Sequence, residues 1–131
     1  RRIASVVTRC LKAVFGDDAY KLKIDFEQKR GKTEAKLILF RDGLELGDPS
    51  EEAGGGVLDV AAMALRLACI LLSMPKRRRL IVLDEPWKFV SAEYRTAVRG
   101  LILTLAKEME FQFIIVTHFK DFMIGHVVEL P

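Results

Sequence analysis

The stretch Arg79-Leu-Ile-Val-Leu-Asp-Glu-Pro86 decides how the rest of the chain can be arranged. Its four aliphatic residues, 80–83, form a short β-favouring run that predicts a strand buried on both faces of a parallel sheet. Asp84 and Glu85 follow at the carboxyl end of this strand, where open α/β sheets bind their ligands. Adjacent acids at that place suit a magnesium-bound nucleotide, but a strand that ends in a solvated acidic turn would look the same.

The composition limits the class of protein. Half of the 131 residues are hydrophobic, which is enough for one domain with a core of its own. The most apolar run, residues 57–74, is interrupted by Asp59 and Arg66. It therefore predicts a buried core helix, not a membrane span, and the sequence has no signal peptide pattern.

Charge and cysteine usage give weaker information. The net charge of +3 is too small to identify a nucleic-acid partner. The basic cluster Lys76-Arg-Arg-Arg79 is either a solvated loop or a contact to a phosphate backbone. Cys10 and Cys69 lie in helical patterns without metal-ligand spacing, which favours a reduced cytosolic setting. Because the chain opens at Arg1 inside an amphipathic pattern, we expect it to be part of a longer protein.

The first third of the chain predicts a helix followed by an antiparallel β-meander. Apolar residues recur at helical spacing over residues 3–15, and Gly16 stops the pattern. Apolar and charged residues then alternate over residues 20–27, as in a half-buried strand. A second strand runs to about Arg41, and Asp42-Gly43 predicts a tight turn.

The second half alternates between helices and strands. A polar, glycine-rich segment leads into the long apolar helix, and four further elements follow the strand at 80–83. The order of predicted elements favours an α/β fold with a parallel core sheet flanked by helices. The further elements are a helix at 93–109, a strand at 111–116, a short helix or turn at 119–124 and a final strand at 126–130.

Three features follow one another along this half: the glycine triplet Gly54-Gly55-Gly56 that opens the apolar helix, the Asp84-Glu85 pair, and Thr117-His118 after the second strand. Glycines let the backbone approach an anion, and the helix start behind them supplies free N–H groups. The two strands would deliver the acids and the histidine to the same sheet edge. Each feature alone is compatible with a flexible loop, an acidic turn or a polar cap, whereas the three in this order favour a nucleotide site.

These features resemble the C-terminal lobe of an ABC-type ATPase head, of the family that includes SMC and double-strand-break-repair ATPases and phage-encoded members. The run from Ala53 to Arg66 resembles the signature motif and its helix. The run Leu80-Ile-Val-Leu-Asp-Glu-Pro86 resembles the Walker B strand, and Val116-Thr-His118 resembles the switch-histidine strand. The resemblance implies a P-loop-NTPase-like lobe over residues 1–131. Residues 1–16 would be a coiled-coil exit helix, 20–47 a β-meander, and 48–131 the part that carries the three motifs.

The resemblance also implies a role for each matched residue. Asp84 would hold Mg2+ through water, Glu85 would orient and deprotonate the attacking water, and His118 would sense the γ-phosphate. The backbone of the glycine triplet, with Ala53 before it, would contact the γ-phosphate of an ATP molecule held by the opposite subunit. The phosphate cradle of the same subunit would come from an N-terminal Walker A lobe that this chain lacks.

Two positions depart from the family pattern, and one motif is misleading. Ala53 stands where relatives have a serine that contacts the phosphate, and Val90-Ser91 stands where they have a Leu-Asp pair that couples the two sites. Arg30-Gly-Lys-Thr33 imitates the end of a P-loop, but Phe26 occupies the position of a required glycine. Strand patterns lie on both sides, so we interpret it as a hairpin turn.

The resemblance predicts an ATPase that acts with Mg2+ as a homodimer of heads around ATP, in DNA repair, recombination or replication. The fragment alone is expected to be inactive. Expected partners are the Walker A lobe of the same protein, DNA and a nuclease, with no membrane, and the expected location is the cytoplasm or nucleoid. Two alternatives stay open: an inert head-like module for dimerisation or DNA tethering, and the ATPase subunit of a transporter.

Overall fold

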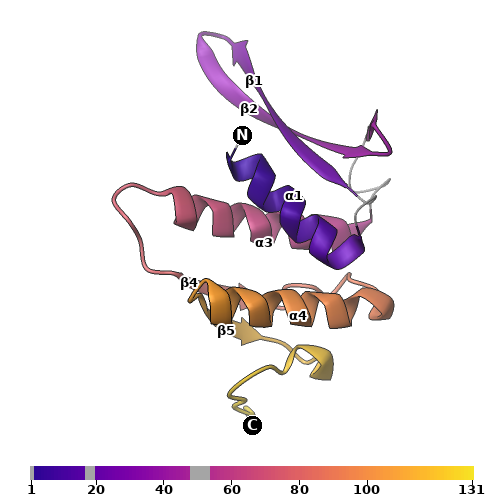
Figure 1. Cartoon of the computed structure of the whole chain (residues 1–131), viewed down its shortest axis with the longest axis vertical. Coiled ribbons are helices and arrows are strands. Elements are labelled where there is room, and N and C mark those ends of the chain that lie inside the picture. Colours follow the sequence, from indigo (N-terminus) through magenta and orange to yellow (C-terminus); the bar gives the residue numbers. More distant parts are fainter. Residues whose placement is uncertain (1, 17–19, 48–53) are drawn as a thin grey trace.

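A computed structural model describes residues 2–16, 20–47 and 54–131 of the chain. The molecule is elongated, with a β-hairpin at one end, crossed helices in the middle and the C-terminal segment at the other end (Figure 1). The elements, in chain order, are α1 (Arg2–Phe15), β1 (Lys21–Lys29), β2 (Lys32–Arg41), β3 (Leu44–Glu45), α3 (Gly55–Leu72), β4 (Leu80–Asp84), α4 (Ala92–Glu108), β5 (Gln112–Val116) and the short 3-10 helix η1 (Lys120–Phe122).

The first three strands form an antiparallel sheet in the order β1-β2-β3. Arg30 and Gly31, with φ angles of 50° and 75°, join β1 to β2. Asp42 and Gly43, with φ angles of 52° and 77°, join β2 to β3. Positive φ at both central residues is typical of the tight turns that connect twisted antiparallel strands. Both turn predictions are therefore confirmed, including the one that rejected a P-loop over residues 30–33.

The second sheet consists of β4 and β5, which pair in parallel from Leu80 with Gln112 to Asp84 with Val116. Both strands therefore end at the same edge. The combination of an antiparallel meander, a parallel pair and flanking helices confirms the predicted α/β class.

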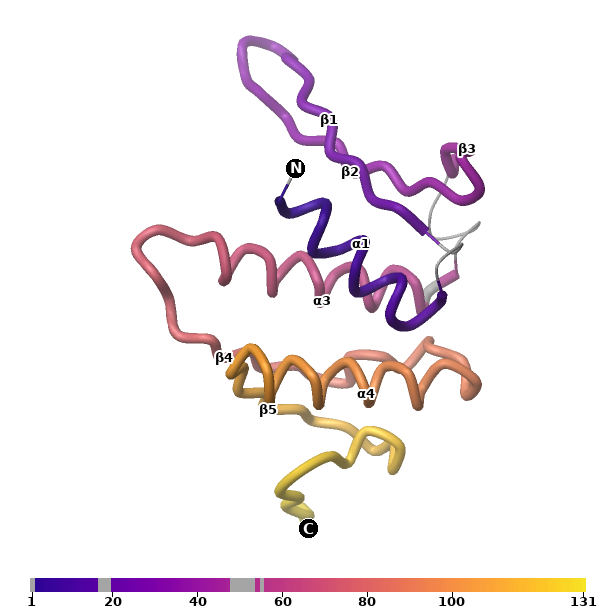
Figure 2. Tube along the Cα trace, viewed as in Figure 1, coloured from indigo at the N-terminus to yellow at the C-terminus, as the bar shows by residue number. Residues whose placement is uncertain are grey.

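Helix α1 holds the two halves of the molecule together, because it packs against α3, α4 and β1. Figure 2 shows its trace crossing that of α3. Phe15, at the end of α1, meets Tyr94 of α4 edge to face, with 4.9 Å between the ring centres. Four side chains of α1 are buried, as its helical pattern predicts: Val7, Cys10, Leu11 and Val14.

The prediction that β4 is buried on both faces is wrong for this chain. Ile81 and Leu83 point into the core, but Leu80 and Val82 are 41% and 57% exposed. Side chains alternate along a strand, and the core helices cover only one face of the sheet. On β5, the exposed face continues with Ile114 and Val116. We call these four apolar residues the open sheet face.

The final strand predicted at 126–130 is also absent. Val127, Val128 and Leu130 are exposed, and the chain beyond η1 adopts no regular structure. A β-favouring run becomes a strand only when a neighbouring strand supplies hydrogen-bond partners, and this run has none beside it in the described part of the chain. None of the helices in the described ranges is long and apolar enough to cross a membrane.

Candidate active site

The carboxyl ends of β4 and β5 bring the predicted acids and histidine to one place. The Glu85 N–H donates to the Val116 carbonyl oxygen at 2.7 Å, which extends the β4–β5 pairing one residue beyond Asp84. Glu85 then adopts a φ of 44°, in the left-handed region that non-glycine residues seldom occupy. This turn of the backbone directs the Glu85 carboxylate towards the segment that follows β5.

Both oxygens of the Glu85 carboxylate have donors from that segment. The backbone N–H of His118 donates to Oε1 at 2.9 Å, and His118 Nδ1 contacts the same oxygen. The Thr117 hydroxyl donates to Oε2 at 3.4 Å, and its oxygen accepts a 3.0 Å hydrogen bond from the Phe119 N–H. The acid after β4 and the histidine after β5 are thus in direct contact.

The two side chains differ in their access to solvent. The Glu85 side chain is 21% exposed, whereas that of His118 is 86% exposed. The His118 ring lies parallel to the Phe119 ring, with 6.0 Å between their centres. The site therefore combines a largely buried carboxylate, fixed by hydrogen bonds, with a solvent-exposed imidazole that a ligand could contact.

The start of α3 has the predicted glycines, and two of them serve different purposes. Gly54 precedes the helix with a φ of 81°, and a Cβ placed on it would meet no atom within 4 Å. A Cβ on Gly56 would lie 3.0 Å from the Val90 Cα and 3.1 Å from the Phe89 carbonyl oxygen. Gly54 thus leaves the helix start open, whereas Gly56 allows close packing. Ala53 lies outside the described residues.

Asp59, in the second turn of α3, was not among the predicted site residues. Its Oδ2 accepts a 3.4 Å hydrogen bond from the Phe89 N–H. Burial raises the pKa of Asp59, and the Phe89 hydrogen bond and the charge of Lys88 oppose that rise. The signal in the sequence was a single acid within an apolar helix. Asp59 and Gly56 together join the start of α3 to the loop that follows Glu85.

That loop, residues 86–91, is fixed by two buried side chains. Trp87 is fully buried and meets Phe122 edge to face at 5.0 Å between ring centres. Val90 is 2% exposed, and its N–H donates to the Trp87 carbonyl oxygen at 3.0 Å. Ser91 is the residue immediately before α4. The Val90-Ser91 pair that departs from the family pattern therefore serves as a core anchor and a helix start.

The donors for a metal ion are few. Within the described residues, no group of three or more His, Cys, Asp or Glu side chains could hold a metal ion. Asp84 is exposed at the end of β4. Magnesium commonly takes one or two carboxylates and completes its shell with phosphate oxygens and water. A single carboxylate at this place thus fits magnesium that arrives with a nucleotide, and does not fit a metal held by the protein alone.

Sequence comparison relates the chain to ATP-binding proteins, although no protein-family model matches it. The chain is 32% identical to a Clostridium tetani protein named as an ABC transporter ATP-binding protein, over 85% of this chain and 24% of the relative. It is 34% identical to a Pyrococcus horikoshii protein of the same description, over 63% of this chain and 28% of the relative. The chain thus spans about a quarter of the length of these curated relatives.

Among solved structures, SMC head domains are similar to this chain in fold. The TM-score is 0.67 with an SMC head bound to the C-winged helix domain of ScpA, at 17% identity over 93% of this chain and 36% of that one. It is 0.65 with a Pyrococcus furiosus head, at 17% identity over 93% and 29%. For the Thermotoga maritima SMC head it is 0.59, at 20% identity over 93% and 39%. In sequence the chain is thus similar to ABC-type ATP-binding proteins, and it has the fold of the C-terminal lobe of an SMC-type ATPase head.

Proposed function

We propose that the chain forms the C-terminal half of an ATP-binding and ATP-hydrolysing SMC-like head, which dimerises around ATP and acts on DNA in repair, recombination or replication. The observation that carries the proposal is the contact between Glu85 and His118 at the shared end of β4 and β5. An acid and an imidazole at the carboxyl ends of parallel strands lie where α/β proteins bind nucleotides.

Glu85 is the residue that takes the proton from the attacking water. Its carboxylate is an acceptor-only group when ionised, and it is already oriented by the His118 N–H and the Thr117 hydroxyl. Phosphoryl transfer depends mainly on positioning and charge stabilisation, so a fixed carboxylate suits it. His118 faces solvent beside Glu85 and meets the terminal phosphate.

Asp84 and the glycines complete the contribution of this chain. Asp84 would hold magnesium through water, and magnesium bound there would supply positive charge beside the phosphates. Gly54, with its open surroundings, leaves room for a phosphate at the start of α3, where free N–H groups and the helix dipole favour an anion. In an SMC-like dimer this phosphate belongs to the ATP of the partner head.

The remainder of the head is a Walker A lobe from the same protein. The open sheet face supports this part of the proposal, because its apolar side chains lie on a sheet that has only two strands within the described residues. Small parallel sheets are covered on both faces in α/β proteins. A lobe that contributes further strands and a covering layer would bury these residues.

The test is nucleotide hydrolysis by a complete head that contains both lobes. Glu85→Gln should leave ATP binding intact, reduce turnover by roughly 10²-fold or more and trap an ATP-bound dimer. Asp84→Asn should instead weaken the dependence on magnesium. The 131-residue chain alone should not hydrolyse ATP, because it has no Walker A motif. Loss of ATP binding in Glu85→Gln, or turnover by the isolated chain, would contradict the proposal.

A transporter ATPase subunit is the second candidate, because the curated relatives are named as ABC transporter ATP-binding proteins. We place the SMC-like head first because the SMC head matches 93% of the chain, which includes most of α1 and the β-meander. Stimulation of hydrolysis by DNA would support the SMC-like head. Stimulation by a membrane-embedded partner, without a response to DNA, would support the transporter. Dimerisation without any hydrolysis would indicate an inert module.

A further inference from the structure

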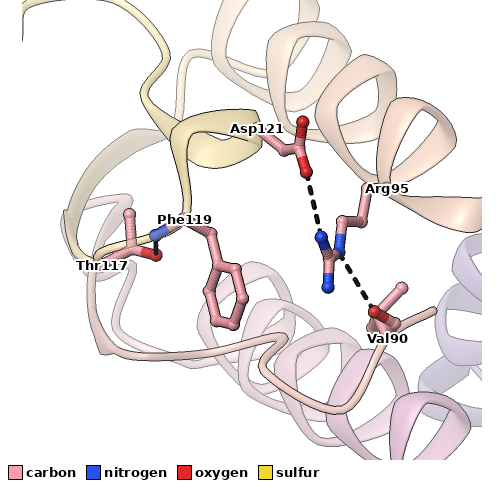
Figure 3. Close-up of polar contacts among 5 residues, drawn as sticks. All are labelled: Val90, Arg95, Thr117, Phe119 and Asp121. Atoms are coloured by element: carbon pink, nitrogen blue, oxygen red, sulfur yellow. Dashed lines mark hydrogen bonds and ion pairs between the residues drawn. The ribbon is translucent and has the colours of Figure 1, made fainter. Parts of the chain in front are cut away.

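Arg95, in the first turn of α4, contacts two segments that lie far from each other in sequence (Figure 3). Its Nε donates to the Val90 carbonyl oxygen at 3.2 Å. Its Nη1 donates to Asp121 Oδ2 at 3.1 Å. The guanidinium carbon also lies 4.8 Å from the centre of the Phe119 ring. The Arg95 side chain therefore contacts three residues at once: Val90, Phe119 and Asp121.

These partners belong to the two segments that carry the candidate site. Val90 lies near the end of the loop 86–91 that follows Glu85. Asp121 lies in η1, which begins directly after the His118-Phe119 pair. The Arg95 side chain is 24% exposed and its bond to Val90 is partly buried, whereas the Asp121 side chain is 55% exposed. A planar guanidinium can direct donors to two acceptors while its face lies on a ring, and a lysine ammonium cannot do all three.

We propose that Arg95 is a positioning residue that holds the loop after Glu85 and the segment after His118 at a fixed separation. The proposal rests on the proposed function for its catalytic consequence, but the clamp itself is a property of this chain. The Glu85–His118 contact joins the two segments at their beginnings, and Arg95 joins them further along. Trp87 also packs on Phe122 between the same segments, so Arg95 adds a polar attachment to an apolar one and restricts the hinge motion that fewer attachments would allow.

A clamp of this kind would matter because hydrolysis depends on where the carboxylate and the imidazole lie. A displacement of about 1 Å at a reacting group can cost as much as 10²-fold in rate. The contacts form a continuous chain of packed and hydrogen-bonded groups from one segment to the other, so a change on one side has a physical route to the other.

The clamp can be tested in the 131-residue chain without any nucleotide. Trp87 is the single tryptophan and lies in the clamped loop, so its fluorescence reports on that loop. Arg95→Ala should shift the emission to longer wavelength and increase quenching by acrylamide in the folded chain. Arg95→Lys should lie between Arg95→Ala and the unmodified chain. Arg99→Ala, one turn further along α4 and exposed, is the matched control and should resemble the unmodified chain.

Asp121→Ala provides a second test of the clamp in case Arg95→Ala does not fold. The Asp121 side chain is 55% exposed, so its removal takes away one contact of the clamp and little packing. It should move the Trp87 signal in the same direction as Arg95→Ala, and the double variant should show less than the sum of the two effects. An unchanged Trp87 signal in both folded variants would overturn the proposal.

The catalytic consequence is tested in a complete head. Arg95→Ala should lower kcat about tenfold or more while the Kd for ATP stays within about twofold, and Arg99→Ala should change neither. Added to Glu85→Gln, Arg95→Ala should cause little further loss, because the positioned group is already gone. Equal loss of kcat in Arg95→Ala and Arg99→Ala would overturn the positioning role. A complete unmodified head without ATPase activity would refute the proposed function, and the fluorescence experiment would still decide on the clamp.

Discussion

Gly56 packs so closely on Val90 that a methyl group on this glycine would lie 3.0 Å from the Val90 Cα. The contact brings the first turn of α3 against the loop that follows Glu85. Backbone atoms form the obstacle, so a side chain on residue 56 cannot be accommodated by the rotation of a neighbour. The glycine that resembles part of a phosphate-binding motif thus has a packing role that holds whether or not a ligand binds.

Gly56→Ala should therefore destabilise the chain by about 1–3 kcal/mol, the usual cost of overpacking. Gly100→Ala is the matched control, because Gly100 lies inside α4 with no atom within 4 Å of an added Cβ. It should stabilise the chain by about 0.5–1 kcal/mol through helix propensity. Urea unfolding measures both. Equal stability of Gly56→Ala and the unmodified chain would contradict the close contact.

Asp59→Asn should stabilise the chain at pH 7. Burial raises the pKa of Asp59 above its ordinary value of 3.8, so the ionised carboxylate is less favourable in the folded chain than in the unfolded one. The protonated acid favours folding below pH 3.8, and this contribution is lost as the pH rises through the raised pKa. The amide oxygen can still accept the Phe89 N–H.

The gain from Asp59→Asn should accordingly be largest at neutral pH and disappear at about pH 3, where the carboxyl group is protonated in both states. Denaturant unfolding at several pH values measures the difference between the two chains. A difference that is constant from pH 7 to pH 3 would show that the substitution acts by packing and not by charge.

The two cysteines should react at very different rates. Cys10 is 5% exposed, and burial raises the pKa of its thiol to about 11, so at pH 8 only about one thiol in 10³ is ionised. Cys69 is exposed. Maleimide labelling followed by mass spectrometry should find one modified cysteine in the folded chain and two in urea. Cys69→Ser should then show almost no labelling until the chain unfolds.

Trp87→Phe should cost far less stability than Trp87→Ala. The alanine variant removes a fully buried ring that packs on Phe122, and such changes cost about 3–5 kcal/mol. Phenylalanine keeps much of the ring contact and removes an indole Nε1 that has no acceptor among the described residues. A buried donor without a partner costs about 1–3 kcal/mol, so its loss offsets part of the lost packing. Thermal unfolding of the two variants provides the comparison.

Local features of the fold could be predicted well from the sequence. The turns at Arg30-Gly31 and Asp42-Gly43 depend on two neighbouring residues each, and their backbone angles agree with the predicted hairpins. The parallel pair β4–β5 also followed from two short aliphatic runs separated by a helix. The contact of Glu85 with the His118 segment then follows from geometry, since parallel strands end at one edge.

Features that depend on distant partners could not be predicted. Residues 126–130 have strand propensity, but no strand in the described part of the chain lies where they could pair. The exposure of one face of β4 could not be predicted from the aliphatic run at 80–83, because a run of apolar residues does not show whether one or both faces of the sheet are covered. Arg95 carried no local signal at all, since its partner Asp121 lies 26 residues away.

Alternation along β4 places Asp84 on the same side of the sheet as Leu80 and Val82. Any layer that covers the open sheet face will also remove water from beside this carboxylate. Removing water from an ionised carboxylate costs much free energy unless a cation lies beside it. If the proposed second lobe covers this face, its association and the binding of a cation at Asp84 should be coupled: the cation should tighten the association of the two lobes, and its removal should loosen it.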